Sequence, residues 1–217
     1  MHHGMPSDCP HFERRGYTGD GQLTCRSAMH LLDMHKFYTK WMEDISDCQD
    51  RLSGHVQYTA PYVHCGGGPG GWGCAIVEVP YQYYKHYGDL SHAERLYPQM
   101  LRYFDYLEAH SKNNLVESDK AGEWCLGDWC APYGPRSPLI FTDSVISMDI
   151  CEKTAYLHEV CGMTAQANFC REVAGKFRAA VREHLIDWSN MTAIGQGTPT
   201  PGCETSQAMA IFYNIFN

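Results

Sequence analysis

Residues 6–22 read PSDCPHFERRGYTGDGQ and form the most specific stretch of the sequence. Three carboxylates, Asp8, Glu13 and Asp20, fall within this one segment. Cleavage of a glycoside requires a protonated acid beside the leaving oxygen and a second carboxylate that acts on water or on carbon. Neighbouring carboxylates oppose one another's ionisation, so one of the three could stay protonated near neutral pH. The residues alone leave a simpler interpretation open, in which the acids pair with Arg14 and Arg15 or cap a following helix.

The rest of the chain predicts helices joined by long loops, without a convincing strand. Apolar residues recur at helical spacing in six stretches, which begin near residues 21, 74, 91, 143, 164 and 203. The first stretch runs to about Asp47 and is expected to be one helix. Gly88 and Gly162 are expected to end helices, while Ser91 with Glu94 predicts a capping box and Thr164 an N-cap.

Other local signals complete this outline. Pro80 is expected to kink the second helix or to mark its first turn. The last helix shows no stop signal, so we expect it to run to the end of the chain and to expose an apolar face. No short sequence repeat is evident, which leaves a helical solenoid or an α/α barrel as the candidate architectures.

Bulk properties narrow the class of partner. The chain has 217 residues and a formal net charge of -8, which argues against nucleic acid because phosphate binding requires a basic face. No apolar stretch is long enough for a membrane span. An acidic sequence with 14 Tyr, 8 Phe and 5 Trp suits a neutral, polyhydroxylated ligand.

Cysteine and histidine usage gives little support to a metal site. The 11 cysteines are an odd number and contain no C-x-x-C pair. Most of those within the helical stretches are expected to be small buried hydrophobic residues. Neither these cysteines nor His2, His3 and His11 show the spacing of metal ligands, and we expect no metal and no cofactor.

The segment 6–22 resembles the D-C-P-x-x-E-R-x-G-(W/Y)-x-G-D signature of the α-L-rhamnosidases of glycoside hydrolase family 78. Its matching positions are Asp8, Cys9, Pro10, Glu13, Arg14, Gly16, Tyr17, Gly19 and Asp20. Later elements of the family pattern are echoed by Trp72, Ala75, Pro80, Tyr84, Tyr87-Gly88-Asp89, Gly127-Asp128-Trp129 and Thr205-Ser206-Gln207-Ala208. The resemblance therefore covers nearly the whole chain.

This resemblance implies an all-α fold, the (α/α)6 barrel, of which residues 1–217 would be about the first half. It further implies hydrolysis of terminal α-L-rhamnosyl residues with inversion, with Glu13 as the general acid. Asp8 and Asp20 would hold rhamnose hydroxyls and tune the acid. The other expected substrate-binding residues are Arg14, Arg15, Trp72, Asp128 and Trp129, whereas Trp124 is as well explained by packing.

Two departures from the family pattern matter. Many members carry an Asp after the loop tryptophan, where this chain has Gly73-Cys74, so the resemblance predicts no polar sugar contact from that position. The family's general base is a Glu far downstream, outside these residues. Glu204 opens the last predicted helix, does not lie in that motif, and is not assigned the role. The chain alone is therefore expected to show weak hydrolysis or none.

Two other classes of function remain as alternatives. One is a sugar-binding fragment with the same pocket and no turnover. The other is a different α/α-barrel carbohydrate-active enzyme, such as a lyase, which would need a Tyr/His or Tyr/Arg pair and an acidic polymer. The resemblance suggests a secreted or periplasmic parent protein, although residues 1–20 carry no signal-peptide pattern. Oligomeric state is not predicted.

Overall fold

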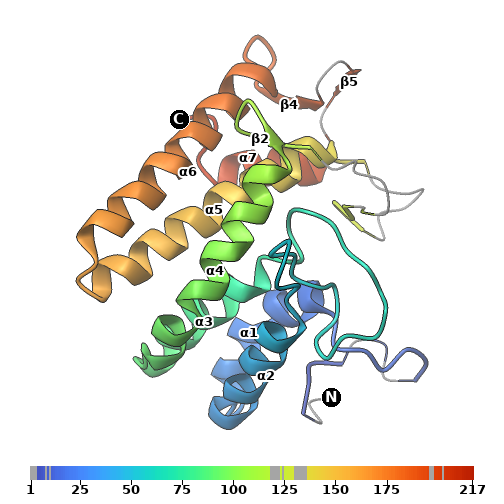
Figure 1. The fold of residues 1–217 in the computed structure, drawn as a ribbon. Helices are drawn as coiled ribbons and strands as arrows, with labels where there is room; N and C mark the ends of the chain where they lie inside the picture. Colours follow the sequence, from blue (N-terminus) through green and yellow to red (C-terminus); the bar gives the residue numbers. More distant parts are fainter. Residues whose placement is uncertain are drawn as a thin grey trace.

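A computed structural model of the chain describes residues 4–7, 9, 11–117, 123, 125–129, 136–195, 198–201 and 203–217. Within these residues the chain forms seven helices and five short strands (Figure 1). The helices are α1 (Thr18–Leu31), α2 (His35–Cys48), α3 (Ala75–Tyr87), α4 (Ser91–Ala109), α5 (Leu139–Val160), α6 (Thr164–His184) and α7 (Glu204–Phe212). The predicted all-α class and the architecture of part of an α/α barrel are confirmed.

The helices form two layers of the kind found in α/α barrels. In one layer α1 contacts α3, α3 contacts α5 and α5 contacts α7. In the other layer α2 contacts α4. Helix α6 packs against α5 of the first layer. Figure 1 shows the pairs α1–α2, α3–α4 and α5–α6 following one another across the molecule. Each pair is an antiparallel hairpin with a short connection, which is the repeating unit of this architecture.

The odd-numbered helices run in the same direction, and this brings their preceding loops to one end. At the start of α1 and α3, Gly19 lies against Trp72. At their last turns, His30 and His86 are in edge contact, with ring centroids 4.9 Å apart. Farther along the layer, Cys203 at the start of α7 lies beside Ser137, just before α5. The loops that precede α1, α3, α5 and α7 therefore lie at the same end of the layer.

The single first helix predicted for residues 21–47 is wrong, because the chain breaks at Leu32 and starts again at His35. Leu32 is extended, with φ -138° and ψ 155°. An Asp33 carboxylate oxygen accepts the His35 N–H at 3.3 Å, the local bond by which Asp favours the start of a helix. The apolar periodicity continues across the break because both helices face the same core.

Helix ends formed by glycine follow the prediction, whereas the predicted side-chain caps do not. Gly88 and Gly162 are left-handed, with φ +72° and +75°. Gly88 caps the end of α3, and Gly162 follows the C-cap residue of α5. The Ser91 capping box is wrong because Ser91 is already helical, and Asp89 accepts its N–H at 2.9 Å instead. Thr164 is likewise the first helical residue, and Met163 occupies the cap. Pro80 lies inside α3 rather than in its first turn.

Short strands were missed by the periodicity argument. Strands β1 (Ser111–Lys112) and β2 (Leu115–Val116) form a hairpin after α4. Strands β3 (Ile186–Asp187), β4 (Thr192–Gly195) and β5 (Thr198–Pro201) form an antiparallel sheet between α6 and α7. Two to four residues are too few to show an alternating pattern in the sequence.

Two apolar clusters stabilise the layers. One joins α1 to α4 around fully buried Trp41, whose indole Nε1 donates to the Ala60 carbonyl at 2.9 Å. The other joins α5, α6, β2 and α7 around Phe141 and Val181. Truncating a buried aromatic residue such as Trp41 to Ala costs about 3–5 kcal/mol, so these contacts fix the platform beneath the loops.

The C-terminal helix ends earlier than expected. It stops at Phe212, and Asn214 takes a left-handed conformation with φ +57°. Ile211 and Phe212 are exposed, as the apolar pattern predicted, whereas Ile215 is buried against the second cluster. None of the helices in the described part of the chain is long and apolar enough to span a membrane.

Candidate functional site

The candidate site is built from the segment before α1 and the loop before α3. These two segments pair as a short antiparallel bridge between Tyr17 and Thr59. Thr18 donates its N–H to the Tyr58 carbonyl at 2.9 Å, and Ala60 donates to the Gly16 carbonyl at 2.8 Å. The pairing fixes the backbone on both sides of Tyr17, so the side chains of residues 13–17 start from a rigid base.

Glu13 is exposed and is held by Tyr17. The Tyr17 hydroxyl donates to Glu13 Oε2 at 2.5 Å. Burial, followed by the hydrogen bond to Glu13, raises the pKa of Tyr17 to about 12, so its hydroxyl keeps its proton at physiological pH. The bond fixes one oxygen of the carboxyl group, and the other has no hydrogen bond to the part of the chain that the structure describes.

Arg15 lies behind this pair. A hydrogen bond with Tyr17 is the largest cause that raises the pKa of the Arg15 guanidinium, and Arg15 Nη1 also donates to Cys65 Sγ at 3.7 Å. Cys65 in turn lies 4.0 Å from the Tyr17 hydroxyl. The charged guanidinium thus polarises a hydroxyl that donates to Glu13, which places positive charge one step behind the carboxyl group.

Trp72 forms the aromatic wall of the same site. Its ring lies edge-on to Tyr17, with centroids 5.6 Å apart, and tilted against Tyr58 at 5.0 Å. The indole lies over Gly19, where an added Cβ would be only 2.7 Å from its ring atoms. Trp72 is therefore brought beside Tyr17, the residue that holds Glu13. An aromatic face of this kind can pack against the apolar face of a sugar.

The other predicted residues of the first segment are placed less completely. Asp8 lies outside the described residues. Asp20 is half-buried in the first turn of α1, on the residue after Gly19. Arg14 is exposed and left-handed, with φ +54°, and its N–H bonds the Cys9 carbonyl. Asp20 thus follows Gly19, the residue that lies against Trp72. Arg14 is part of a tight turn closed by its hydrogen bond to the Cys9 carbonyl.

Asp128 and Trp129 lie in the loop before α5. The Asp128 carboxylate accepts the backbone N–H groups of Arg136 and Ser137 at 2.9 and 3.2 Å, so it holds the entry to α5. The Cys203 thiol lies 3.8 Å from Asp128 and 2.9 Å from the Ser137 hydroxyl. Trp129 is 60% exposed. No hydrogen bond or ring contact between this pair and the Glu13–Tyr17 group is found among the described residues, and Trp124 lies outside them.

Three residues of the site's framework were not assigned from the sequence. Tyr17 stood within the signature, four residues from Glu13, and its role could have been inferred from that spacing. Cys65 and Asp143 gave no such signal, because each contacts residues that are far from it in the chain, 48 and 50 residues for Cys65 with Tyr17 and Arg15. Asp143 lies beneath the loop that carries Trp72.

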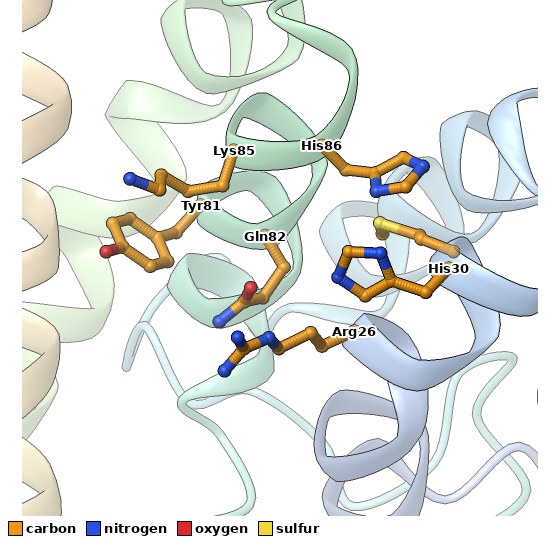
Figure 2. Close-up of a pocket in the computed structure, with 7 residues that line it drawn as sticks. Arg26, His30, Tyr81, Gln82, Lys85 and His86 are labelled. Atoms are coloured by element: carbon orange, nitrogen blue, oxygen red, sulfur yellow. The ribbon is translucent and has the colours of Figure 1, made fainter.

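A separate pocket of about 420 Å³ lies between the last turns of α1 and α3, lined by Arg26, Met29, His30, Tyr81, Gln82, Lys85 and His86 (Figure 2). It is at the opposite end of these helices from Gly19 and Trp72, roughly 15 Å away for a helix rise of 1.5 Å per residue. Cations at helix C-termini offset the negative end of the helix dipole, and Lys85 also lies 5.1 Å above the Tyr156 ring. The pocket is therefore not part of the Glu13 site.

No grouping of three or more metal-binding side chains occurs in the portion of the chain that the structure describes. Ten described cysteines are free thiols. Burial raises the pKa of Cys25 to about 12 and that of Cys170 to about 11. Cys25 and Cys170 are thus small core residues, whereas Cys65 and Cys203 are partly buried and make polar contacts in the loops before the helices.

Comparisons with known proteins agree with this arrangement. The family model described as the bacterial α-L-rhamnosidase six-hairpin glycosidase domain matches residues 1–217. An α-L-rhamnosidase of Formosa agariphila is 30% identical over 171 residues, which are 74% of this chain and 17% of that protein. A second, from Streptomyces avermitilis, is 36% identical over 121 residues, 55% of this chain and 12% of that protein.

Solved structures give the same result. The crystal structure of Streptomyces avermitilis α-L-rhamnosidase complexed with L-rhamnose superposes with a TM-score of 0.84 at 25% identity, over 97% of this chain and 19% of that one. The α-L-rhamnosidase of Dictyoglumus thermophilum shares the fold, with a TM-score of 0.83 at 24% identity, over 98% of this chain and 24% of that one. The chain thus spans 12–17% of these two curated relatives and 19–24% of these two solved structures. It belongs to the bacterial α-L-rhamnosidase six-hairpin glycosidase family.

Proposed function

We propose that the protein containing this chain hydrolyses terminal α-L-rhamnosyl residues of glycans or glycosides, and that Glu13 is the general acid. The observation that carries the proposal is the 2.5 Å hydrogen bond from the Tyr17 hydroxyl to Glu13, beside the Trp72 ring. It places a fixed carboxyl group next to an aromatic surface, which is what protonation of a bound glycoside requires. Membership of the rhamnosidase family supports the choice of sugar.

Glu13 would transfer its proton to the glycosidic oxygen through Oε1, because Tyr17 occupies Oε2. As the bond breaks, Glu13 becomes a carboxylate, and the Tyr17 hydroxyl, backed by Arg15, stabilises that charge. Trp72 would pack against the apolar face and methyl group of rhamnose. Asp8 and Asp20 would bind its hydroxyls, and Arg14, Asp128 and Trp129 would complete the substrate contacts.

Inversion is the second part of the proposal. An inverting enzyme activates a water molecule with a carboxylate on the opposite face of the sugar, about 6.5–9.5 Å from the acid. No residue of this chain is assigned as that base. The first-formed product would be β-L-rhamnose, and proton NMR of the anomeric signals in the first minutes of turnover distinguishes it from the retained α anomer.

The test of the activity is release of p-nitrophenol from p-nitrophenyl α-L-rhamnopyranoside by the chain and by Glu13→Gln. Glu183→Gln is the matched control, because Glu183 is an exposed glutamate on α6. Turnover that falls in Glu13→Gln and persists in Glu183→Gln supports the proposal. Equal turnover in all three proteins, with this substrate and with methyl α-L-rhamnopyranoside, contradicts the role of Glu13.

A chain without turnover is tested by calorimetric titration with L-rhamnose. Binding that is lost on replacement of Trp72 by Ala supports the second candidate function, a sugar-binding fragment with the same site. Absence of binding in every protein shows that residues 1–217 do not form a rhamnose site by themselves, and contradicts both candidates for this chain.

A further inference from the structure

Asp143 is a buried carboxylic acid that the proposed mechanism does not use. It lies in the second turn of α5 and is 2% exposed. Its carboxyl group accepts the backbone N–H of Gly71, and a Cβ added to Gly70 would lie 2.3 Å from its Oδ1 atom. Gly70 also has φ +104°. The loop therefore approaches Asp143 as closely as only a glycine backbone permits.

The same short loop is tied down by hydrogen bonds from three other elements. Gln22 of α1 donates to the Gly71 carbonyl at 2.5 Å, and Tyr103 of α4 donates to the Gly70 carbonyl at 2.7 Å. Cys125, from the loop before α5, donates to the Pro69 carbonyl at 2.7 Å. These bonds hold the carbonyl groups, whereas Asp143 binds the N–H of Gly71. The next residue is Trp72, so these contacts determine where the indole lies.

The carboxyl group is incompletely satisfied. Its Oδ2 atom has no hydrogen-bond partner among the described residues, and an unpaired oxygen at such depth costs more when it is charged. Burial raises the pKa of Asp143 to about 7, against the opposing effects of the Cys125 thiol and the Gly71 N–H. Asp143 therefore changes charge in the physiological range.

The titratable groups around Asp143 come from three segments. Tyr58 and Cys74 face it from the loop before α3, and Cys125 faces it from the loop before α5. Burial raises the pKa of Cys74 and of Tyr58, so neither titrates near pH 7. From α4, Tyr103 is fully buried and its pKa is likewise raised. The pKa of Asp143 is set by burial, the Cys125 thiol and the Gly71 N–H, and none of these is a cation.

We propose that Asp143 is a positioning residue of the sugar site: its carboxyl group holds the Gly70–Gly71 backbone against α5 and thereby sets the place of the Trp72 indole beside Tyr17 and Gly19. The consequence for sugar binding rests on the proposed function. The neutral carboxyl group accepts the Gly71 N–H without burying a charge. Ionisation places an uncompensated charge beneath the loop, so the loop and Trp72 shift to admit water.

The position of Trp72 is followed by its fluorescence between pH 5 and pH 9, taken as the difference between each protein and the same protein with Trp72→Phe. Three variants are compared with the unmodified chain: Asp143→Asn, which keeps an acceptor oxygen and cannot ionise, Asp143→Ala, which has no acceptor, and Ser147→Ala. Ser147 is a fully buried polar residue one turn along the same helix, so Ser147→Ala controls for loss of a buried polar group.

We expect the Trp72 signal of the unmodified chain and of Ser147→Ala to titrate with a midpoint near pH 7, and that of Asp143→Asn to be flat. Asp143→Asn retains every histidine, so a titration that survives in it comes from another group and overturns the proposal. A flat signal in the unmodified chain also overturns it. If Asp143→Ala does not fold, the Asn variant and the pH series still decide the question.

Rhamnose titration separates this inference from the proposed function. At pH 5.5 we expect Asp143→Ala to bind rhamnose about tenfold more weakly than the unmodified chain, as for loss of one buried hydrogen bond, and Asp143→Asn to bind with unchanged affinity. Unchanged affinity in folded Asp143→Ala overturns the positioning role. If no protein binds rhamnose while the Trp72 titration depends on Asp143, the proposed function fails for this chain and the positioning role stands.

Discussion

The Tyr17 hydroxyl donates a 2.5 Å hydrogen bond to Glu13 Oε2 across one turn of the segment before α1. Because the pKa of Tyr17 is raised to about 12, the bond has a fixed direction over the whole physiological range. Tyr17 also contacts Trp72, so one residue joins the acid to the aromatic wall. The arrangement gives the Glu13 carboxyl group a fixed orientation beside this wall.

Replacement of Tyr17 by Phe should lower kcat for rhamnoside hydrolysis and leave KM nearly unchanged. A hydrogen bond to a charged group is worth about 1.5–3 kcal/mol, which corresponds to a loss of about tenfold to a hundredfold in kcat. The ring contact with Trp72 is retained in the variant. Tyr62→Phe is the control, since Tyr62 is a partly exposed tyrosine of the loop before α3. An unchanged kcat in Tyr17→Phe would show that the bond does not assist the acid.

Gly19→Ala should destabilise the fold and weaken sugar binding together. The new Cβ would lie 2.7 Å from the Trp72 ring, and overpacking of this kind costs about 1–3 kcal/mol. Gly175→Ala is the matched control, because a Cβ at that helical glycine meets nothing within 4 Å and should stabilise the protein slightly. Urea unfolding measures both changes. Equal stability of the two variants would mean that Trp72 moves aside without cost.

Lys153→Met should be strongly destabilising. Lys153 joins Glu78 of α3 at 2.5 Å and Asp149 of α5 at 2.6 Å, and all three side chains are at least four-fifths buried. Removing the cation leaves two buried carboxylates without a counter-charge, at a cost of about 3 kcal/mol. Lys176→Met, which breaks the exposed pair with Glu172, should cost much less. Thermal unfolding of the two variants compares them, and similar losses would contradict the buried role of Lys153.

Asp143→Asn should alter how stability depends on pH. The pKa of Asp143 is about 7 in the folded chain and about 3.9 in the unfolded chain. Below both values the shift has no effect. Between them the unfolded chain is ionised while the folded chain is protonated, so the unmodified chain loses up to about 1.4 kcal/mol per pH unit relative to the variant. The loss is complete above pH 7.

Urea unfolding of both proteins at pH 5, 6, 7 and 8 measures this difference directly. The Asn variant should gain on the unmodified chain as the pH rises to 7 and then keep a constant advantage. A difference that is constant from pH 5 to pH 8 would mean that the Asp143 carboxyl group titrates outside this range.

The parts of the fold set by local chemistry could be predicted from the sequence. Gly88 and Gly162 marked two helix ends correctly because a left-handed residue favours glycine. The break between α1 and α2 was missed because Leu32 and Met34 continue the apolar periodicity through it, and only Asp33 marks the new start. The two predicted caps were each misplaced by one residue. At Ser91, the Asp89 carboxylate accepts the backbone N–H that Glu94 would accept in a capping box.

The candidate site also has a part that the sequence predicts and a part that it does not. Glu13 and Tyr17 are four residues apart, so one sequence signature can contain both. The contacts of Cys65, Trp72 and Asp143 depend on how α1, α3 and α5 pack, and no local pattern records such packing. Asp143 is a buried acid on a helix, against the rule that such acids face solvent, so no sequence pattern singled it out.

The central claim is that Glu13 acts as the general acid, and the most direct measurement compares two leaving groups. The rate lost in Glu13→Gln is determined for methyl α-L-rhamnopyranoside and for p-nitrophenyl α-L-rhamnopyranoside. Methoxide is a poor leaving group that needs a proton, so its hydrolysis should fall by about 10²–10⁴-fold, as expected for loss of general acid catalysis. The p-nitrophenolate leaves without full protonation, and its rate should fall much less. Equal losses for the two substrates would contradict the assignment of Glu13.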